Sequence, residues 1–219
     1  IRPAIALHLE RGREALQETV VITDRELPLN LTGESPFGNL LAQAVRQFTG
    51  SQLSLVNTGQ LMGSLPQGEI TTGLLHALCP SPINACSMML SGRDIRIALE
   101  QSLAESFQNK VIYGYGFRGE RLGSLAVDGL KILSNPQGMP YDNGIAIFVE
   151  GEPLEDERDY SVGTLDMFTF QMGYESIAKG KDTTFMLPYF LRDLLRIELG
   201  RPGSMEECGV FRWDPQLFK

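Results

Sequence analysis

Residues 51–73 read SQLSLVNTGQLMGSLPQGEITTG, and the predicted organisation of the chain is built around this stretch. The apolar residues of 53–56 predict a buried strand, which ends at the Asn-Thr-Gly of 57–59. Residues 65–68, Leu-Pro-Gln-Gly, suit a type I turn, and a helix start follows at 71–72. A strand that ends in an Asn/Gly loop offers backbone N–H groups and a short amide at the sheet edge. Such loops bind small molecules in many proteins and are plain connections in many others, so both interpretations stay open.

The composition is that of a soluble globular protein of one large domain or two small ones. The chain has 219 residues, of which 42% are hydrophobic and 21% charged. Its net charge of −8 and pI near 4.9 leave no basic surface for nucleic acid. No apolar run approaches the roughly 20 residues that span a bilayer, so no membrane partner is expected. No signal peptide is visible, and because the chain starts at Ile1 rather than Met we expect it to be cut from a longer protein.

The chain is poor in residues that bind metals. It has three cysteines and two histidines, without a CxxC, an HExxH or a paired histidine spacing, so no metal site and no cofactor are expected in this chain. Cys79 and Cys86 either pair in a disulfide or are small buried residues, and their spacing favours the second interpretation. The odd cysteine count slightly favours a reducing, cytoplasmic compartment, while an extracytoplasmic or cell-surface location stays open.

Residues 35–49 carry the clearest helix signal. Ser35 suits the N-cap, Pro36 suits the first helical position, and Gly50 suits the C-terminal stop. Apolar residues recur at helical spacing between them and predict one buried face. Further helices are expected at 4–18, 71–78, 92–107 and 185–200, and strands at 19–23, 85–90, 125–133, 145–151 and 160–165, with turn signals at 135–138 and 141–144.

No linker divides the chain, so the helix-rich and strand-rich parts are expected to share one α+β core. Residues 1–18 form either an interdomain linker helix or a simple terminal helix, and residues 19–219 form the domain. In the predicted 185–200 helix, the expected buried face includes Leu187 and Ile197. The tail from 201 onwards, which contains the single tryptophan, is expected to pack as a final irregular strand.

Two segments combine glycines with exposed aromatic residues. The first, VIYGYGFRGERLG at 111–123, is too rich in glycine for a helix interior. It is either a flexible loop or a ligand-binding loop in which Phe117 stacks on a ring and Arg118 binds phosphate. The second, DMFTFQMGY at 166–174, follows a predicted strand and again ends at a glycine and an aromatic residue.

Four motifs in order resemble the C-terminal domain of the 5′-nucleotidase/UDP-sugar hydrolase family, over about residues 19–200. Residues 34–42, ESPFGNLLA, are similar to the family's E-x-x-x-G-N-L helix start, and NTG at 57–59 with LPQGEIT at 65–71 is similar to N-G-G-G-I-R and P-x-G-x-I-T. The segment from Pro80 to Glu100 and the segment from Gly151 to Thr164 resemble P-F-G-N…A-L-E and G-x-P-L…Y-x-V-A-T.

The resemblance implies a layered α/β/β/α sandwich with mixed sheets in a single domain. It also implies the substrate-binding half of a metal-dependent phosphoesterase that hydrolyses nucleotides, such as a 5′-nucleotidase or UDP-sugar hydrolase. The two divalent metal ions and the catalytic histidine would lie in an N-terminal metallophosphoesterase domain, which is the expected partner. This chain alone is therefore not expected to be catalytic, and a homodimer stays open.

The sequence departs from the family pattern at four places. The arginine of the N-G-G-G-I-R loop falls at Met62, and the arginine upstream of E-x-x-x-G-N falls near Leu31. The stacking Phe of P-F-G-N falls at Ser81, and the G-G-D-G-F/Y turn is QMGY at 171–174. Losing two cationic phosphate ligands and one stacking ring weakens adenosine-type binding.

Of the nucleotide-contacting positions that the resemblance implies, the sequence keeps the amide at Asn57 and the aromatic ring at Tyr174. The loops of residues 111–123 and 166–174 are expected to replace the lost groups. In this hypothesis Asn57 binds the base or sugar, Arg118 neutralises phosphate, and an aromatic ring of 168–174 stacks. The alternative is a structural or oligomerising module whose nucleotide site has decayed. The predicted substrate-binding residues are Asn57, Gly59, Asn84, Phe117, Arg118, Asp166, Phe168, Phe170 and Tyr174.

Overall fold

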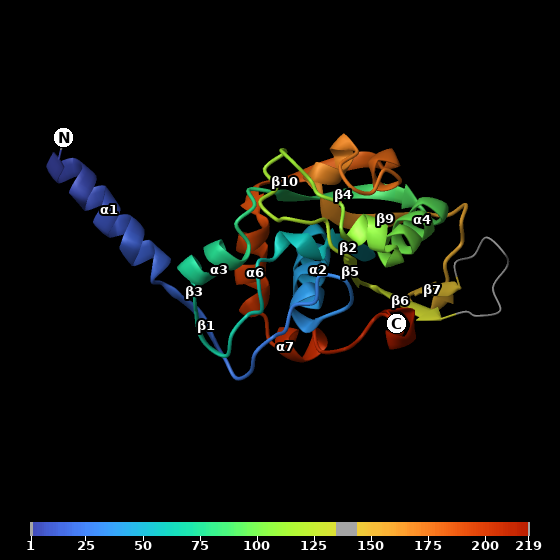
Figure 1. Cartoon of the computed structure of the whole chain (residues 1–219), viewed down its shortest axis with the longest axis horizontal. Helices are drawn as coiled ribbons and strands as arrows, with labels where there is room; N and C mark the ends of the chain where they lie inside the picture. Colours follow the sequence, from blue (N-terminus) through green and yellow to red (C-terminus); the bar gives the residue numbers. More distant parts are fainter. Residues whose placement is uncertain (1, 135–143, 219) are drawn as a thin grey trace.

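The computed structural model describes residues 2–134 and 144–218 of the chain. Within these residues a central sheet of five strands has the order β10-β4-β9-β2-β5 (Figure 1). Strand β2 runs parallel to β9 and the other neighbours run antiparallel, so the sheet is mixed. The predicted α+β class, with mixed sheets in a single domain, is confirmed. The central strands are β2 (Leu53–Asn57), β4 (Asn84–Ser91), β5 (Leu125–Asp128), β9 (Asp159–Leu165) and β10 (Lys181–Phe190).

Two smaller sheets lie beside the central one. The sequence did not predict β3, which is a four-residue strand and pairs antiparallel with β1. The single strand predicted over 125–133 is wrong, because the chain turns at Gly129, where φ is 78°, and forms β5 of the central sheet and then β6. Strand β6 pairs antiparallel with β7, and the predicted turn signals at 135–138 and most of 141–144 lie outside the described residues. The strands of the smaller sheets are β1 (Thr19–Thr23), β3 (Gly68–Thr71), β6 (Leu130–Ser134), β7 (Ile145–Val149) and β8 (Glu152–Pro153).

Helix α2 (Pro36–Thr49) is the core helix that covers the central sheet. It contacts β5, β2 and β9 and also packs against α6. The predicted apolar stripe is buried, and the expected cap residues flank the helix. Gly50 adopts the left-handed conformation that ends the helix, as predicted. Ser35 lies at the N-cap in an extended conformation, but its side chain makes no capping hydrogen bond.

The remaining helices lie around this core. Helix α1 (Arg2–Leu16) projects from the body (Figure 1). The helix predicted over 92–107 is broken at Ala104, whose ψ of 126° is extended, so it forms two elements. The other helical elements are α3 (Thr72–Leu78), α4 (Gly92–Leu103), α5 (Glu105–Gln108), α6 (Leu191–Leu199), α7 (Ser204–Glu207), and the short 3-10 turns η1 (Thr58–Gln60), η2 (Asp166–Phe170), η3 (Ile177–Lys179) and η4 (Pro215–Phe218).

The helix predicted over 185–200 is wrong in its first part. Residues 185–190 complete the edge strand β10, which pairs antiparallel with β4, and the helix begins only at Leu191. Inside a helix Pro188 would have no N–H to donate to the helical hydrogen-bond pattern. As part of β10 it lies instead in a segment that pairs with β4. Two residues expected on the buried face are exposed, since Leu187 is 67% and Ile197 is 53% accessible.

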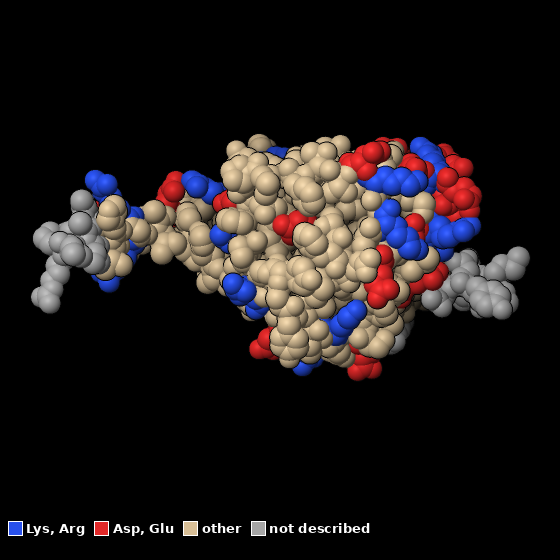
Figure 2. All heavy atoms as spheres, turned by 90° about the horizontal axis from the view of Figure 1, so that it is seen from above, with Lys and Arg blue, Asp and Glu red and all other residues tan. Residues whose placement is uncertain are grey.

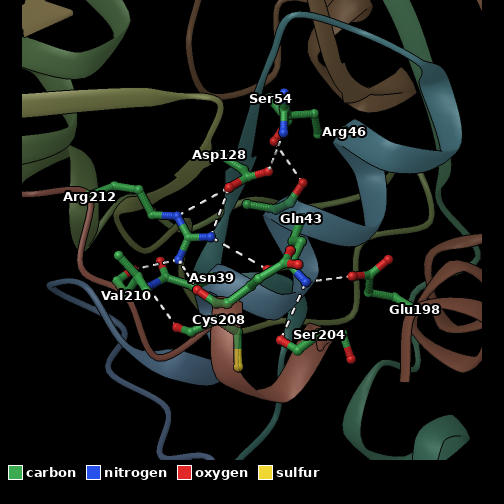
Figure 3. A network of polar contacts seen from close by, with 12 residues as sticks. Asn39, Gln43, Arg46, Ser54, Asp128, Glu198, Ser204, Cys208, Val210 and Arg212 are labelled. Carbon is green, nitrogen blue, oxygen red and sulfur yellow. Dashed lines mark hydrogen bonds and ion pairs between the residues drawn. The ribbon is translucent and has the colours of Figure 1, made fainter. Parts of the chain in front are cut away.

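The tail is not the strand that we expected from the sequence. It forms α7 and η4, and Trp213 contributes only an isolated bridge to Ile132. A polar network fastens this tail to α2 and to the central sheet (Figure 3). The Arg212 guanidinium pairs with Asp128 at 2.8 Å, and both side chains are only 10% exposed. The Glu34 carboxylate accepts hydrogen bonds from the backbone N–H groups of Arg212 and Trp213.

Candidate functional site

Three predicted site residues lie at one end of the central sheet. Strands β4 and β9 pair with Ala85 opposite Leu165, which brings Asn84 and Asp166 to the same sheet end. Strand β2 runs parallel to β9 and ends at Asn57, so Asn57 lies at this end too. The Gly-rich loop of residues 109–124 closes over it through hydrogen bonds to 57–59. The strand register therefore brings Asn57, Asn84 and Asp166 to the same end of the central sheet.

Asn57 and Gly59 hold the Gly-rich loop in place. The Asn57 side chain is fully buried, and its Nδ2 donates to the Leu122 carbonyl at 2.8 Å while its Oδ1 accepts from Gln60. The Gly59 N–H also donates to the Leu122 carbonyl. A Cβ on Gly59 would lie 2.0 Å from the Arg121 carbonyl oxygen, so only glycine fits. In this conformation both Nδ2 and Oδ1 of Asn57 are hydrogen-bonded to other groups of the chain.

Asn84 and Asp166 form a second polar contact at the sheet end. The Asn84 N–H donates to Asp166 Oδ2 at 3.2 Å, and the Asn84 side chain donates to the Tyr189 carbonyl at 2.7 Å. Burial raises the pKa of Asp166, although backbone N–H groups of Asn84 and Met167 oppose the shift by binding the carboxylate. Asp166 is half-buried and thus offers an acceptor to a ligand hydroxyl.

Three of the predicted aromatic residues belong to the core. Phe117, Phe168 and Tyr174 are at most 5% exposed. Tyr174 stacks on Phe107 with ring centroids 5.7 Å apart, and its hydroxyl donates to the Gly123 carbonyl. Burial also raises the pKa of Tyr174. These rings belong to the core, and of the three only Phe117 keeps a small accessible part of 5%.

Phe170 and Tyr115 form an exposed aromatic pair. Each side chain is 56% exposed, and the rings stack with centroids 5.5 Å apart and an interplanar angle of 27°. Tyr115 has a positive φ of 51° between two glycines that also have positive φ, so the backbone turns tightly to present the ring. Sequence reasoning named Phe170 but missed Tyr115, although the Gly-Tyr-Gly pattern was a signal for it.

Arg118 is exposed at the outer part of the Gly-rich loop. Its backbone N–H donates to the Ser81 hydroxyl at 3.1 Å, which ties the loop to the proline-rich segment before β4. The loop surrounds a hollow of about 410 Å³ whose lining includes Phe117, Arg118 and Glu120. Within the described residues the Arg118 guanidinium makes no ion pair, so it is free to meet an anion.

A second hollow opens beside the loop of residues 57–59. It measures about 440 Å³ and is lined by Leu31, Gly59, Leu61, Met62, Glu120 and Arg121. The family pattern has arginines at Met62 and near Leu31, and both of these residues line this pocket. Arg121 was missed by sequence reasoning, and its place three residues after Arg118 was the available signal. Its Nη1 donates to Asn109 Oδ1 at 3.0 Å.

The charged side chains are distributed unevenly over the surface of the domain. Figure 2 shows that acidic and basic side chains gather at one end of the upper face, while most of that face is uncharged.

Over residues 2–134 and 144–218, no three His, Cys, Asp or Glu side chains are arranged to hold a metal ion. The same part of the chain has no helix long and apolar enough to cross a membrane. The three cysteines are free thiols, so Cys79 and Cys86 are not paired.

Comparisons with known proteins agree with this architecture. Residues 15–178 match the family model for the 5′-nucleotidase C-terminal domain. The uncharacterized metallophosphoesterase YunD of Bacillus subtilis (strain 168) is 32% identical over 199 residues, covering 88% of this chain and 42% of that protein.

Solved structures share the fold at lower identity. The 5′-nucleotidase precursor of Thermus thermophilus superposes with a TM-score of 0.71 at 19% identity, covering 97% of this chain and 42% of that one. A putative 5′-nucleotidase of Staphylococcus aureus gives 0.69 at 14% identity, covering 95% and 43%. The chain thus spans about two fifths of the length of these relatives.

Proposed function

This chain belongs to the family of 5′-nucleotidase C-terminal domains, and we propose that it is the substrate-binding domain of a metal-dependent phosphoesterase acting on nucleotides or related phosphate esters. The observation that carries the proposal is the exposed aromatic pair, which joins the Gly-rich loop to η2. The half-buried Asp166 begins η2, and the Gly-rich loop carries Arg118 and Arg121, each of which lines a hollow. Flat rings, hydroxyl groups and phosphates are the chemical parts of a nucleotide, and these residue types bind them.

In this proposal the catalytic step takes place in a domain outside this chain. The described residues do not fit a metal centre, so we assign the divalent metal ions to an N-terminal metallophosphoesterase domain, the proposed partner of residues 19–219. Helix α1, within residues 1–18, would link the two domains. The 219-residue chain with a divalent metal added should not hydrolyse AMP, and hydrolysis at an enzymic rate would contradict this assignment.

Each group at the site would have a defined task. The rings of Tyr115 and Phe170 would stack on a base, a contact worth about 1–3 kcal/mol for each base. Asp166 would accept a hydrogen bond from a sugar hydroxyl, and Arg118 and Arg121 would balance negative charge. Asn57 and Gly59 would act indirectly, by fixing the loop that carries both arginines.

Calorimetric titration of the 219-residue chain with AMP tests the proposal. We expect Phe170→Ala and Tyr115→Ala each to weaken binding by about 5- to 150-fold, which corresponds to the loss of one stacking contact. Phe211→Ala is the control, because Phe211 is a similarly exposed ring, at 54%, and lies on the tail away from both hollows. Equal affinities of wild type and both ring variants would contradict the assigned stacking role.

A structural or oligomerising module is the second candidate, and one observation favours it. Several predicted contact residues are buried, while β10 at the sheet edge exposes Phe185, Leu187 and Tyr189. A thermal-shift panel of nucleotides and sugar phosphates separates the two functions, because a ligand that binds only the folded state raises Tm. A shift that Arg118→Ala abolishes supports substrate binding, and no shift at millimolar ligand supports the structural module.

A further inference from the structure

Strand β10 is an edge of the central sheet and carries an exposed apolar surface. Its side chains Phe185, Leu187 and Tyr189, which we call the β10 surface, are 45%, 67% and 45% exposed. They occupy every second residue of the segment, and the most exposed of them lies in the middle. Three large apolar side chains that lie so close together in water favour contact with another protein surface.

The free edge of β10 is not suited to a continuous ladder with further strands. Phe185 lies opposite Cys86 and Phe190 lies opposite Asn84, so the chain between these pairs forms a bulge. Pro188 lies within the bulge and has no N–H to donate to a neighbouring strand. Edge strands avoid open-ended pairing by such bulges and prolines. We therefore expect a partner to contact the side chains of the bulge, in an assembly that closes.

Contacts with the rest of the domain hold the β10 surface in place. The Asn84 side chain donates to the Tyr189 carbonyl at 2.7 Å. The Tyr189 ring packs edge-on against Phe48, with ring centroids 5.1 Å apart, and Phe48 packs in turn against the core. Because the backbone of the bulge and one of its rings are already fixed, a partner that covers them loses little conformational entropy on binding.

The charges that flank the β10 surface form a pattern that complements itself. Lys181 and Asp182 precede the apolar residues, and Arg192 and Asp193 follow them. Two copies of this segment can be placed antiparallel, with Leu187 opposite Leu187 of the other copy. In this arrangement Asp182 faces Arg192 of the other copy, and Lys181 faces Asp193 of the other copy. A two-fold axis repeats each of these contacts, so four opposite-charge contacts flank the apolar centre.

The flanking charges are available for such contacts. Among the described residues, Asp182 and Arg192 form no ion pair within the chain. Arg192 donates to the Ser81 carbonyl at 3.4 Å, which leaves its charge without an anionic partner. Lys181 reaches Asp159 only at 4.0 Å, and both side chains are exposed, so this pair contributes little.

We propose that β10 and the first turn of α6 form the contact surface of a symmetric homodimer, with its two-fold axis at Leu187. The axis sets Phe185 of one copy opposite Tyr189 of the other and covers the β10 surface of both. The segment is shorter than the about 20–30 residues that each side of a standard interface contributes, so we expect a dissociation constant in the micromolar range. The dimer does not depend on nucleotide binding, and either proposal can therefore fail alone.

Sedimentation equilibrium of the 219-residue chain, from low micromolar to submillimolar concentration, tests the proposal. We expect wild type to change from monomer to dimer over this range. Leu187→Glu places two carboxylates on the axis and should raise the dissociation constant at least about a hundredfold. Val210→Glu is the matched control, because Val210 is a similarly exposed apolar residue, at 63%, on the tail after α7. Helix α7 and β10 lie at opposite sides of the molecule (Figure 1).

A charge exchange tests the register. Asp182→Lys sets two cations against each other and Arg192→Glu sets two anions against each other, so each variant alone should dimerise about tenfold more weakly than wild type. An equimolar mixture of the two variants should recover wild-type affinity. In the mixed dimer the new lysine of one copy meets the new glutamate of the other, and the second contact keeps the original pair. Circular dichroism first establishes that each variant is folded.

The outcomes decide between a second copy and other partners. A wild-type chain that stays monomeric at every concentration shows that another partner, such as the proposed N-terminal domain, covers the β10 surface, and it overturns the inference. Equal dimerisation of Leu187→Glu and Val210→Glu also overturns it. So does a mixture of folded charge variants that associates no better than either variant alone, or a wild-type assembly larger than a dimer.

Discussion

The thiols of Cys79 and Cys86 are fully buried, and burial raises the pKa of each to about 12. Burial also raises the pKa of Cys208 to about 11. Only the thiolate reacts with disulfides and alkylating reagents. These residues therefore act as small apolar core residues, whose reactivity depends on whether the chain is folded.

We predict that the folded chain resists thiol labelling. At about pH 8 only about one in ten thousand Cys79 or Cys86 side chains is a thiolate, so a disulfide reagent should not react within minutes. In concentrated guanidinium chloride all three cysteines should react at once. Mass spectrometry counts the labels, and fast labelling of Cys79 or Cys86 under native conditions would contradict their burial.

Asp166 gives a prediction that depends on pH. Its folded-state pKa is raised above the ordinary value of 3.8, so the folded state binds the proton more tightly than the unfolded state does. The free energy of unfolding is therefore unaffected by this shift below the ordinary pKa, and it decreases as pH rises through the raised pKa. At neutral pH the ionised, half-buried carboxylate destabilises the fold.

Asp166→Asn should raise the free energy of unfolding at neutral pH and lose this advantage at acidic pH. The amide oxygen can still accept the Asn84 N–H, so the sheet end keeps its contact. Urea denaturation at two pH values measures the difference. Glu175→Gln, at an exposed residue between η2 and η3, is the control and should not change stability at neutral pH. A destabilised Asp166→Asn variant at neutral pH would show that the hydrogen bonds of the carboxylate outweigh its desolvation.

At the scale of elements, α2 shows how a local signal becomes a buried helix. Its predicted stripe is buried from Phe37 to Val45 and half-buried at Phe48, and the helix packs against the central sheet and α6. Gly50 ends the helix, and its N–H donates to the Arg46 carbonyl. A helix with one apolar face, a proline at its start and a glycine at its end needs little tertiary information to be predicted.

Leu41→Ala should lower the free energy of unfolding by about 3 kcal/mol, because it leaves a cavity at a fully buried position. Gln47→Ala, on the exposed side of the same helix, is the control and should change stability by less than about 0.5 kcal/mol. Chemical denaturation measures both. A loss below about 1 kcal/mol for Leu41→Ala would mean that the core collapses into the space.

Strand β10 shows the opposite case. Residues 185–190 and 191–199 both contain apolar residues at spacings that a helix can use, so the sequence pattern joined them. In the fold, β4 provides a pairing edge for the first segment, and the Asp193 carboxylate accepts the Phe190 N–H where α6 begins. The boundary depends on a partner strand that lies about 100 residues away in the sequence, which local periodicity cannot detect.

At the scale of the whole molecule, the network of Figure 3 joins distant parts of the chain. Asp128 at the end of β5 pairs with Arg212 of the tail and with Arg46 of α2. Glu34 accepts N–H groups of the tail, and burial raises its pKa despite these hydrogen bonds. The tail is thus fastened through charges that are mostly removed from water.

Arg212→Met should lower the free energy of unfolding by about 3 kcal/mol, because Asp128 keeps only its more exposed partner Arg46. Arg212→Lys keeps the charge but loses the paired hydrogen bonds, so its loss should be smaller. Trp213 is the single tryptophan and lies in the buried part of the tail, so its fluorescence reports tail release. Wild-type stability and unchanged fluorescence of Arg212→Met would contradict the fastening role.

The sequence by itself determined the elements whose signals are local, namely α2, β2 and the Asn-Thr-Gly ending of β2, and it placed Asn57, Asn84 and Asp166 at strand ends. Only the tertiary structure decided which side chains reach solvent. It buried Phe117, Phe168 and Tyr174, exposed Tyr115 beside Phe170, and brought Arg121 to the pocket that Leu31 and Met62 also line. The physical reason is that capping and periodicity act within one or two turns. Burial and pocket formation depend instead on strand pairing and loop packing between residues far apart in the chain.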